Sequence, residues 1–160
     1  LEGIHLLCYF RNLSLLKQFD NYIYNNLPDL INVDDKWGKQ LIFNEDDEVI
    51  GKENKLLISS VNLSMDDIID TVHSYKGIVF PAHVNRYANS INTVLGFIPE
   101  NLKIAGIELT STNKENDYQK YHIIKNSDAH YLGDINEKIN SLVLREKTIT
   151  DFFAYFGGEV

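Results

Sequence analysis

The stretch GIVFPAHVNR, residues 77–86, places a short apolar run directly before a histidine and an arginine. Its composition predicts a buried β-strand that ends at Pro81, because proline has no backbone N–H to donate to a sheet. His83 lies just past this strand, and Arg86 follows it by three residues. The stretch therefore predicts a buried strand that carries candidate functional side chains at its end.

Further apolar runs alternate along the chain with segments of helical pattern. We expect strands over residues 3–10, 77–83, 104–111, 122–130 and 141–146. We expect helices over residues 13–27, 65–77, 89–97, 113–121 and 148–156, the second capped by Ser64 and ended by Gly77. Two apolar runs around an acidic turn predict a β-hairpin within residues 34–55. The alternation favours an α/β fold with βα units and a mostly parallel sheet.

Composition limits the classes of function. The chain has 160 residues, 44% of them hydrophobic, which suffices for one domain with its own core. A net charge of −8 argues against a scaffold for duplex DNA, although bound cations could offset that charge beside a phosphate ester. Cys8 is the single cysteine, and we expect a buried, inert thiol. Without a signal peptide or an apolar run of membrane length, we expect a cytoplasmic protein with no membrane partner.

Four residues with metal-ligating side chains fall near the ends of expected strands. They are His5, His83, Asp128 and His130. In parallel α/β folds the strand ends on one side of the sheet collect functional groups, and imidazole and carboxylate groups bind zinc, manganese or iron. Asp128 and His130 share a face if their segment is extended. Taken singly, each residue also fits an ordinary structural role.

The motifs FPAHVNR (80–86) and IKNSDAHYLGDI (124–135), with GIHLLCYF (3–10) upstream, resemble the polymerase and histidinol phosphatase (PHP) superfamily. They are most similar to its small bacterial stand-alone phosphoesterases. The resemblance implies a distorted (β/α)7 TIM-like barrel with two or three divalent ions, zinc, manganese or iron, at the carboxyl ends of its strands. It also implies metal-dependent hydrolysis of a phosphomonoester or of a nucleotide or oligonucleotide phosphodiester.

Matched to the family motifs, individual residues acquire expected roles. The resemblance implies that His5 and His83 bind one ion. It implies that Asp128 binds a second ion and that His130 binds a third. His130 is also a candidate to protonate the leaving oxygen, and Arg86 is a candidate to hold the phosphate through two parallel hydrogen bonds.

The chain departs from the family pattern at its amino end. The H-x-H pair, the further histidines and the bridging glutamate with which the family opens are missing from this sequence. We therefore expect residues 1–160 to be the C-terminal two-thirds of a PHP domain, with an inserted hairpin near 34–55 and a barrel that is incomplete at its N-terminus. Such a fragment alone should bind metal poorly and be inactive.

Two other functions stay open at this point. One is a non-catalytic PHP-like domain or fragment that has lost its metal site, and the other is a metal-dependent amidohydrolase on a similar barrel. Under the main interpretation the partner is a small phosphorylated substrate, such as a nucleotide or short oligonucleotide. The sequence does not indicate the oligomeric state.

Overall fold

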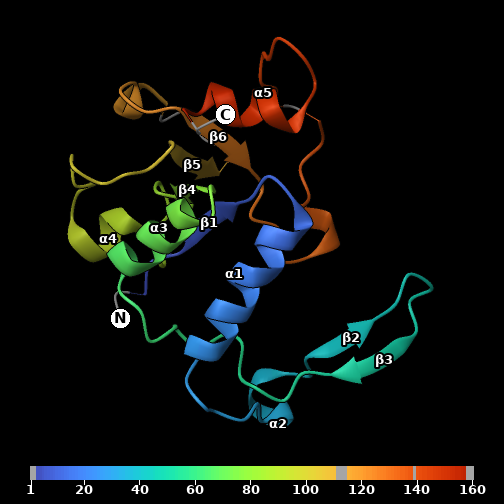
Figure 1. The fold of residues 1–160 in the computed structure, drawn as a ribbon. Coiled ribbons are helices and arrows are strands. Elements are labelled where there is room, and N and C mark those ends of the chain that lie inside the picture. Colours follow the sequence, from blue (N-terminus) through green and yellow to red (C-terminus); the bar gives the residue numbers. More distant parts are fainter. Residues whose placement is uncertain (1–2, 111–114, 139, 158–160) are drawn as a thin grey trace.

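The computed structural model describes residues 3–110, 115–138 and 140–157 (Figure 1). Its strands are β1 (Leu6–Tyr9), β2 (Leu41–Phe43), β3 (Val49–Lys52), β4 (Ile78–Pro81), β5 (Ile107–Thr110) and β6 (Ile123–Asn126). Its α-helices are α1 (Leu13–Asn26), α2 (Asp34–Trp37), α3 (Met65–Ser74), α4 (Ile91–Leu95) and α5 (Ile149–Tyr155). Two short 3₁₀ helices, η1 (Glu115–Tyr118) and η2 (Leu132–Asp134), flank β6. None of the helices in these ranges is long and apolar enough to cross a membrane.

The body of the molecule is organised around β4, whose four residues are all buried. Because side chains alternate along a strand, Val79 joins a hydrophobic cluster with α1 and α3, while Ile78 and Phe80 join a second cluster with α5. Phe80 meets Phe156 edge to face, with ring centroids 4.9 Å apart. Figure 1 shows β1, β4, β5 and β6 lying between α5 on one side and α1, α3 and α4 on the other. The apolar run at residues 77–81 is thus the centre of the core.

The strands pair only two by two. β1 runs antiparallel to β4, with Leu7 opposite Phe80, and β5 runs parallel to β6, with Ile107 opposite Ile123. Two hydrogen bonds link the pairs: the Ala105 N–H donates to the Val79 carbonyl at 2.9 Å, and the Val84 N–H donates to the Glu108 carbonyl at 3.0 Å. β4 and β5 therefore lie side by side without a continuous ladder between them.

The expected seven-stranded barrel is wrong. The described strands form three separate two-stranded sheets, and no closed barrel exists among them. Four body strands of four residues each are too few and too short to close a barrel, which takes about eight strands. The expectation of a mostly parallel sheet fails at β1, because the connection through α1, β2, β3 and α3 brings β4 back in the opposite direction. The chain is a small α/β protein with short strands.

Other expected elements were largely found, with two exceptions. The strand expected over residues 141–146 is irregular chain, and Val143 is 89% exposed. A strand needs a neighbour with which to share its backbone hydrogen bonds, and none of the described strands pairs with this segment. The helix expected over residues 113–121 is only the 3₁₀ helix η1, and residues 113 and 114 lie outside the described ranges.

Polar caps define the helix ends. The Ser64 hydroxyl accepts from the Asp67 N–H at 3.1 Å, and the Asp67 carboxylate accepts from the Ser64 N–H at 3.2 Å, which completes a capping box at α3. At the other end of α3, Lys76 and not Gly77 adopts the left-handed conformation, with φ +57°. Gly77 is required for a different reason, because a Cβ there would lie 2.8 Å from the Tyr9 carbonyl oxygen.

Cys8 lies in β1, beside the core. Burial raises the pKa of its thiol to about 12. A thiol with so high a pKa is almost entirely protonated at neutral pH and is a poor nucleophile. The structure agrees with the expectation of an inert thiol.

Gly106 precedes β5 at a point of close approach and gives a test of this packing. A Cβ there would collide with the His122 carbonyl oxygen and lie 2.9 Å from Phe80 Cε1. We expect Gly106→Ala to lower the free energy of unfolding by about 1–3 kcal/mol, because neither the backbone nor the core ring can move away. Urea denaturation would measure the change.

Gly133→Ala is the matched control, because a Cβ there would meet nothing within 4 Å. It should leave the unfolding midpoint within experimental error. Equal effects of the two substitutions would contradict the packing described here.

Candidate functional site

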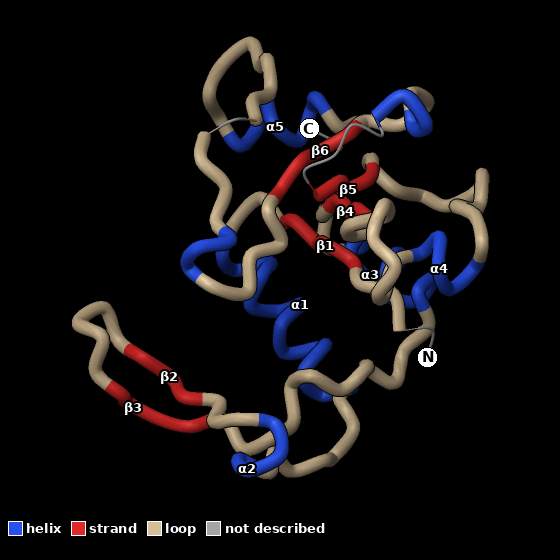
Figure 2. Tube along the Cα trace, turned by 180° about the vertical axis from the view of Figure 1, so that it is seen from behind, coloured by secondary structure: helices blue, strands red, loops and turns tan. Residues whose placement is uncertain are grey.

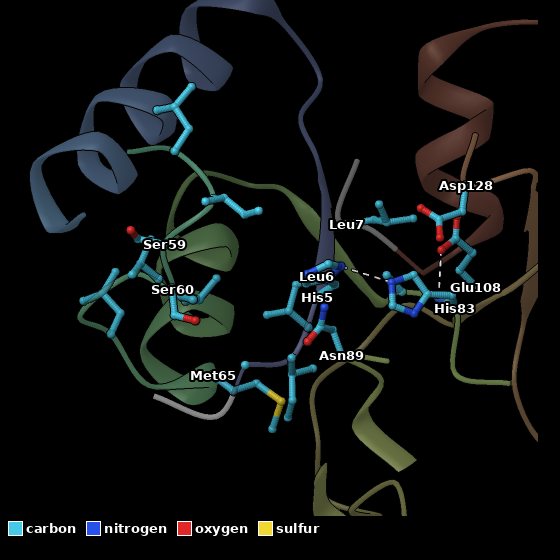
Figure 3. A pocket seen from close by; sticks show the side chains of 18 of the residues that line it. His5, Leu6, Leu7, Ser59, Ser60, Met65, His83, Asn89, Glu108 and Asp128 are labelled. Carbon is cyan, nitrogen blue, oxygen red and sulfur yellow. Dashed lines mark hydrogen bonds between the residues drawn. The ribbon is translucent and has the colours of Figure 1, made fainter. Parts of the chain in front are cut away.

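A cavity of about 810 Å³ opens where the body strands end (Figure 3). Since β1 is antiparallel to β4, its amino end lies beside the carboxyl end of β4. The polar side chains that line the cavity are His5, His83, Asn89, Glu108, Asn126, Asp128, His130, Ser59 and Ser60. Residues 57–68 contribute a largely apolar wall. All four predicted metal ligands therefore line one cavity.

His5 and His83 face each other across the cavity floor (Figure 3). His5 Nδ1 lies 3.1 Å from His83 Nε2, and the two rings meet at 70°. The backbone of His5 is fixed on both sides, because its N–H donates to the Asn89 carbonyl and its carbonyl accepts from the Ala82 N–H, both at 2.9 Å. Partial burial, followed by the neighbouring His83 ring, lowers the pKa of His5, and Asp128 opposes the shift. The lowered pKa favours a neutral ring with a lone pair free to bind.

The second ring nitrogen of His83 is an unsatisfied buried group. The side chain is 4% exposed, and Nδ1 forms no hydrogen bond with any residue that the structure describes. Leaving a buried polar atom unpaired costs about 1–3 kcal/mol. Such an atom needs an explanation, and a bound ligand or ion would supply one.

Backbone strain collects around the same cavity. Five described residues other than glycine have positive φ, and three of them line the cavity: His83 at +33°, Asn89 at +53° and Asp128 at +51°. Side chains with a Cβ reach this region at a cost of about 1–2 kcal/mol. Strain of this kind persists where the surrounding structure holds it, which is common at functional sites.

Glu108, in β5, holds His83 in place. Glu108 is 3% exposed, and its carboxylate accepts from the His83 backbone N–H at 2.8 Å and from the Asn126 side-chain amide at 2.7 Å. One buried carboxylate thereby ties the ends of β4, β5 and β6 together. The pKa of Tyr9 is raised first by burial and second by the negative charge of Glu108.

Arg86 and Asp128 form an ion pair at the edge of the cavity. Arg86 Nη1 lies 2.5 Å from Asp128 Oδ2, and Arg86 Nε donates to the Thr110 hydroxyl at 3.2 Å. The two side chains are 45% and 25% exposed, respectively. The guanidinium thus already binds an anionic oxygen at this position, which is the geometry that a phosphate oxygen would use.

His130 is oriented by a neighbouring carbonyl. Its Nδ1 lies 2.9 Å from the Asp128 carbonyl oxygen. Because a carbonyl can only accept, Nδ1 carries the proton and Nε2 presents a lone pair in the neutral ring. The expectation that Asp128 and His130 share a face of an extended segment does not hold, since Asp128 has the left-handed conformation.

The donor set fits a metal ion in part. Two nitrogens bound to one tetrahedral ion at about 2.0–2.1 Å lie about 3.3 Å apart, close to the 3.1 Å between the rings of His5 and His83. The hydrogen bond from His130 Nδ1 is the arrangement that orients a ligating imidazole. Over the described parts of the chain, however, no group of three or more His, Cys, Asp or Glu side chains could hold an ion. The imidazole pair by itself therefore does not make a metal site among the described residues.

The sequence analysis did not single out Asn126, Thr110 or Asn89. Asn126 and Thr110 are the last residues of β6 and β5, and Asn89 supplies its carbonyl to His5. A polar residue at the end of a buried strand is a weak signal that could have indicated the first two. No pattern in the sequence indicates Asn89, because its contact depends on a loop conformation.

Comparison with known proteins gives a likeness in structure. No family model matches the chain. No curated protein matches it either. A crystal structure described as the novel lesion-specific endonuclease PfuEndoQ from Pyrococcus furiosus is similar, with a TM-score of 0.58 and 16% sequence identity. The match covers 97% of this chain and 36% of that one, so the chain spans about a third of the endonuclease's length. At this identity the likeness describes a shared fold.

The role of Glu108 in holding the site can be tested by stability. Glu108→Ala leaves the His83 N–H and the Asn126 amide without their acceptor, so we expect a loss of about 2–5 kcal/mol in the free energy of unfolding. Glu108→Gln keeps the volume and one acceptor, and should lie between the wild type and Glu108→Ala. Chemical denaturation followed by circular dichroism would rank the three proteins.

Glu137→Ala, at an exposed glutamate, is the control and should change stability by less than about 0.5 kcal/mol. If Glu108→Ala were as stable as this control, the carboxylate would not organise the site.

Proposed function

We propose that this chain is part of a PHP-type, divalent-metal-dependent hydrolase of phosphate esters. The observation that supports the proposal most directly is the approach of His5 Nδ1 and His83 Nε2 to 3.1 Å inside the cavity. The strained backbone at His83 and Asp128 adds to it. The similar crystal structure is described as an endonuclease, an enzyme that hydrolyses phosphodiesters. The likeness in fold makes phosphate ester hydrolysis the natural reaction to test.

We propose His5, His83, Asp128 and His130 as metal ligands, with zinc, manganese or iron as the ion. Bound divalent cations would supply Lewis acidity and a water molecule of lowered pKa. The remaining donors would come from outside this set.

Arg86 and His130 have proposed roles toward the substrate. Arg86 would exchange its contact with Asp128 for a phosphate oxygen and offset the charge that develops on the phosphoryl group. His130, in its protonated form, would donate from Nε2 to the leaving oxygen. A ring that binds an ion through Nε2 cannot also donate from it, so the two roles belong to different steps or different states.

The cavity indicates the size of the substrate. A volume of about 810 Å³ is much larger than a phosphate group needs, and the wall formed by residues 57–68 is largely apolar. We propose a small phosphorylated partner with a sizeable organic group, such as a nucleotide or a short oligonucleotide. The acidic chain does not favour a long duplex.

A non-catalytic domain is the second candidate. It is favoured by the finding that no described set of three or more ligating side chains could hold an ion. Metal binding without turnover, or no metal binding at all, would support this candidate over the hydrolase.

The metal site can be tested with His83→Ala in the full-length protein, where the remaining donors would be present. The substitution removes one of the paired rings, so we expect the bound manganese or zinc, measured by elemental analysis after dialysis, to fall by about one ion per chain. Hydrolysis of p-nitrophenyl phosphate and bis(p-nitrophenyl) phosphate should fall at least 100-fold, as should wild-type activity after treatment with EDTA.

His73→Ala is the matched control. This histidine is exposed on α3 and bonds the Lys103 carbonyl, away from the cavity. It should keep both metal and turnover. Full metal content and activity in His83→Ala would refute the site assignment.

The role of Arg86 can be tested through KM. Arg86→Ala removes a charged donor worth about 1.5–3 kcal/mol, so KM for a phosphate ester should rise about 10–100-fold. Arg86→Lys should recover only part, because an ammonium cannot make two parallel hydrogen bonds.

Arg145→Ala provides the comparison, since Arg145 also forms an ion pair, with Asp151 at 2.8 Å, but lies outside the cavity. Its KM should equal that of the wild type. A KM for Arg86→Ala within twofold of the wild-type value would remove Arg86 from the site.

A further inference from the structure

The hairpin of β2 and β3, residues 41–52, stands away from the body and is called the arm here. Figures 1 and 2 show from opposite sides that it projects beyond α1 and α2. Among the strands described, β2 and β3 pair only with each other. Every residue of these two strands except Gly51 is exposed. An isolated two-stranded hairpin in water is marginally stable at best.

The arm carries apolar side chains on both of its faces. Leu41 and Ile42 lie on opposite faces, because neighbouring strand residues alternate, and the register of the hairpin shifts between Ile42 and Phe43. Phe43 is 53% exposed and Ile50 is 63% exposed. A hairpin that merely projected into solvent would have at least one polar face.

The apolar surface continues onto the segment that supports the arm, residues 30–40, called the arm base here. Nine of the 24 exposed large hydrophobic side chains of the described residues lie between residues 30 and 50. They are Leu30, Ile31, Val33, Trp37, Leu41, Ile42, Phe43, Val49 and Ile50. Monomeric soluble proteins rarely expose so concentrated an apolar patch, and larger patches mark interaction sites.

Both ends of the arm are held by hydrogen bonds. At the base, the Gln40 side-chain amide donates to the carbonyls of Glu53 and Lys55, and its oxygen accepts from the Leu57 N–H at 3.1 Å. At the tip, the Asn44 side-chain oxygen accepts from the N–H groups of Asp46 and Glu48. The apolar surface is therefore presented in a fixed shape, which lowers the entropy cost of binding.

Charge is distributed unequally along the arm. The tip carries four exposed carboxylates in a row, Glu45, Asp46, Asp47 and Glu48. The arm base carries Asp34, Asp35, Lys36 and Lys39, and Asp34 is paired with Lys52 at 2.8 Å. Lys36 and Lys39 are exposed, form no ion pair with any residue in the described ranges, and outnumber the remaining carboxylate of Asp35. Two arms side by side in the same direction would place eight carboxylates together. Two arms in opposite directions would place each acidic tip near the lysines of the other arm base.

We propose that the arm is a dimerisation element, and that two copies of this chain bury their arms against each other in antiparallel orientation about a two-fold axis. Such an interface is self-complementary, since the same surface serves on both chains. The apolar faces supply the buried surface, and the tip-to-base charges set the direction and favour this arrangement over a parallel one. The proposal is independent of the hydrolase assignment, because none of these side chains lines the cavity.

Sedimentation equilibrium on the full chain tests the apolar contact. We expect the wild type to be a dimer at about 100 µM, and Phe43→Ser to raise the dimer dissociation constant at least tenfold. Phe43 is exposed, so the substitution leaves the core untouched. Phe97→Ser is the matched control, because Phe97 is 62% exposed after α4, far from the arm (Figures 1 and 2). A wild type that stays monomeric, or an equal effect of both substitutions, overturns the proposal.

A mixing experiment tests the antiparallel direction. One chain carries Glu45→Lys, Asp46→Lys and Glu48→Lys, which turn the four negative charges of the tip into three positive charges and one negative charge. A second chain carries Lys36→Glu and Lys39→Glu at the base. Each variant alone should associate at least tenfold more weakly than the wild type, since its tip and base now repel. An equimolar mixture should recover dimers, because both tip-to-base contacts become attractive in the mixed pair. Failure of the mixture to associate better than either variant alone overturns the proposed orientation.

Discussion

The burial of β4 on both faces is the constraint from which the rest of the molecule follows. Ile78 and Phe80 pack with α5 on one face, and Val79 packs with α1 and α3 on the other. A strand so enclosed cannot slip by one residue, because every side chain would change faces. Its register fixes where Pro81 ends the strand, and thereby where His83 begins the turn that follows. The cavity is consequently placed by core packing, although none of the core residues takes part in its chemistry.

A second layer of organisation comes from polar groups that satisfy one another out of water. Glu108 joins the ends of three strands through two acceptor oxygens, and its burial is tolerated because both oxygens are hydrogen-bonded. His83 is the exception within this network, with one ring nitrogen unpaired and a strained backbone. Proteins depart from local rules mainly at functional sites, and here the departures coincide with the polar end of the cavity. The site is thus distinguished from a polar surface patch by its energetics as well as by its residue types.

The sequence allowed most elements to be located but not their assembly. The apolar runs located every strand that the structure describes, and Ser64, the expected cap, begins α3 with a capping box. Strand direction was missed at β1, because periodicity reports which residues are buried and carries no information on pairing. The irregular segment 141–146 was missed for the related reason that an apolar run becomes a strand only beside a partner. At the site, the sequence predicted the residue types and their positions after strands. It could not predict the positive φ of Asp128 or the contact of Arg86 with Asp128, because both depend on loop geometry.

The facing rings of His5 and His83 belong to positions 78 residues apart in the chain. In the unfolded polypeptide that separation corresponds to a large loop, and the two imidazoles would meet only rarely. A ligand that bound both rings at once would connect positions separated by nearly half of the sequence. Because it would bind the folded state and not the unfolded chain, its binding free energy would add to the stability of the whole fold. Occupancy of both rings by such a ligand would raise the free energy of unfolding by mass action.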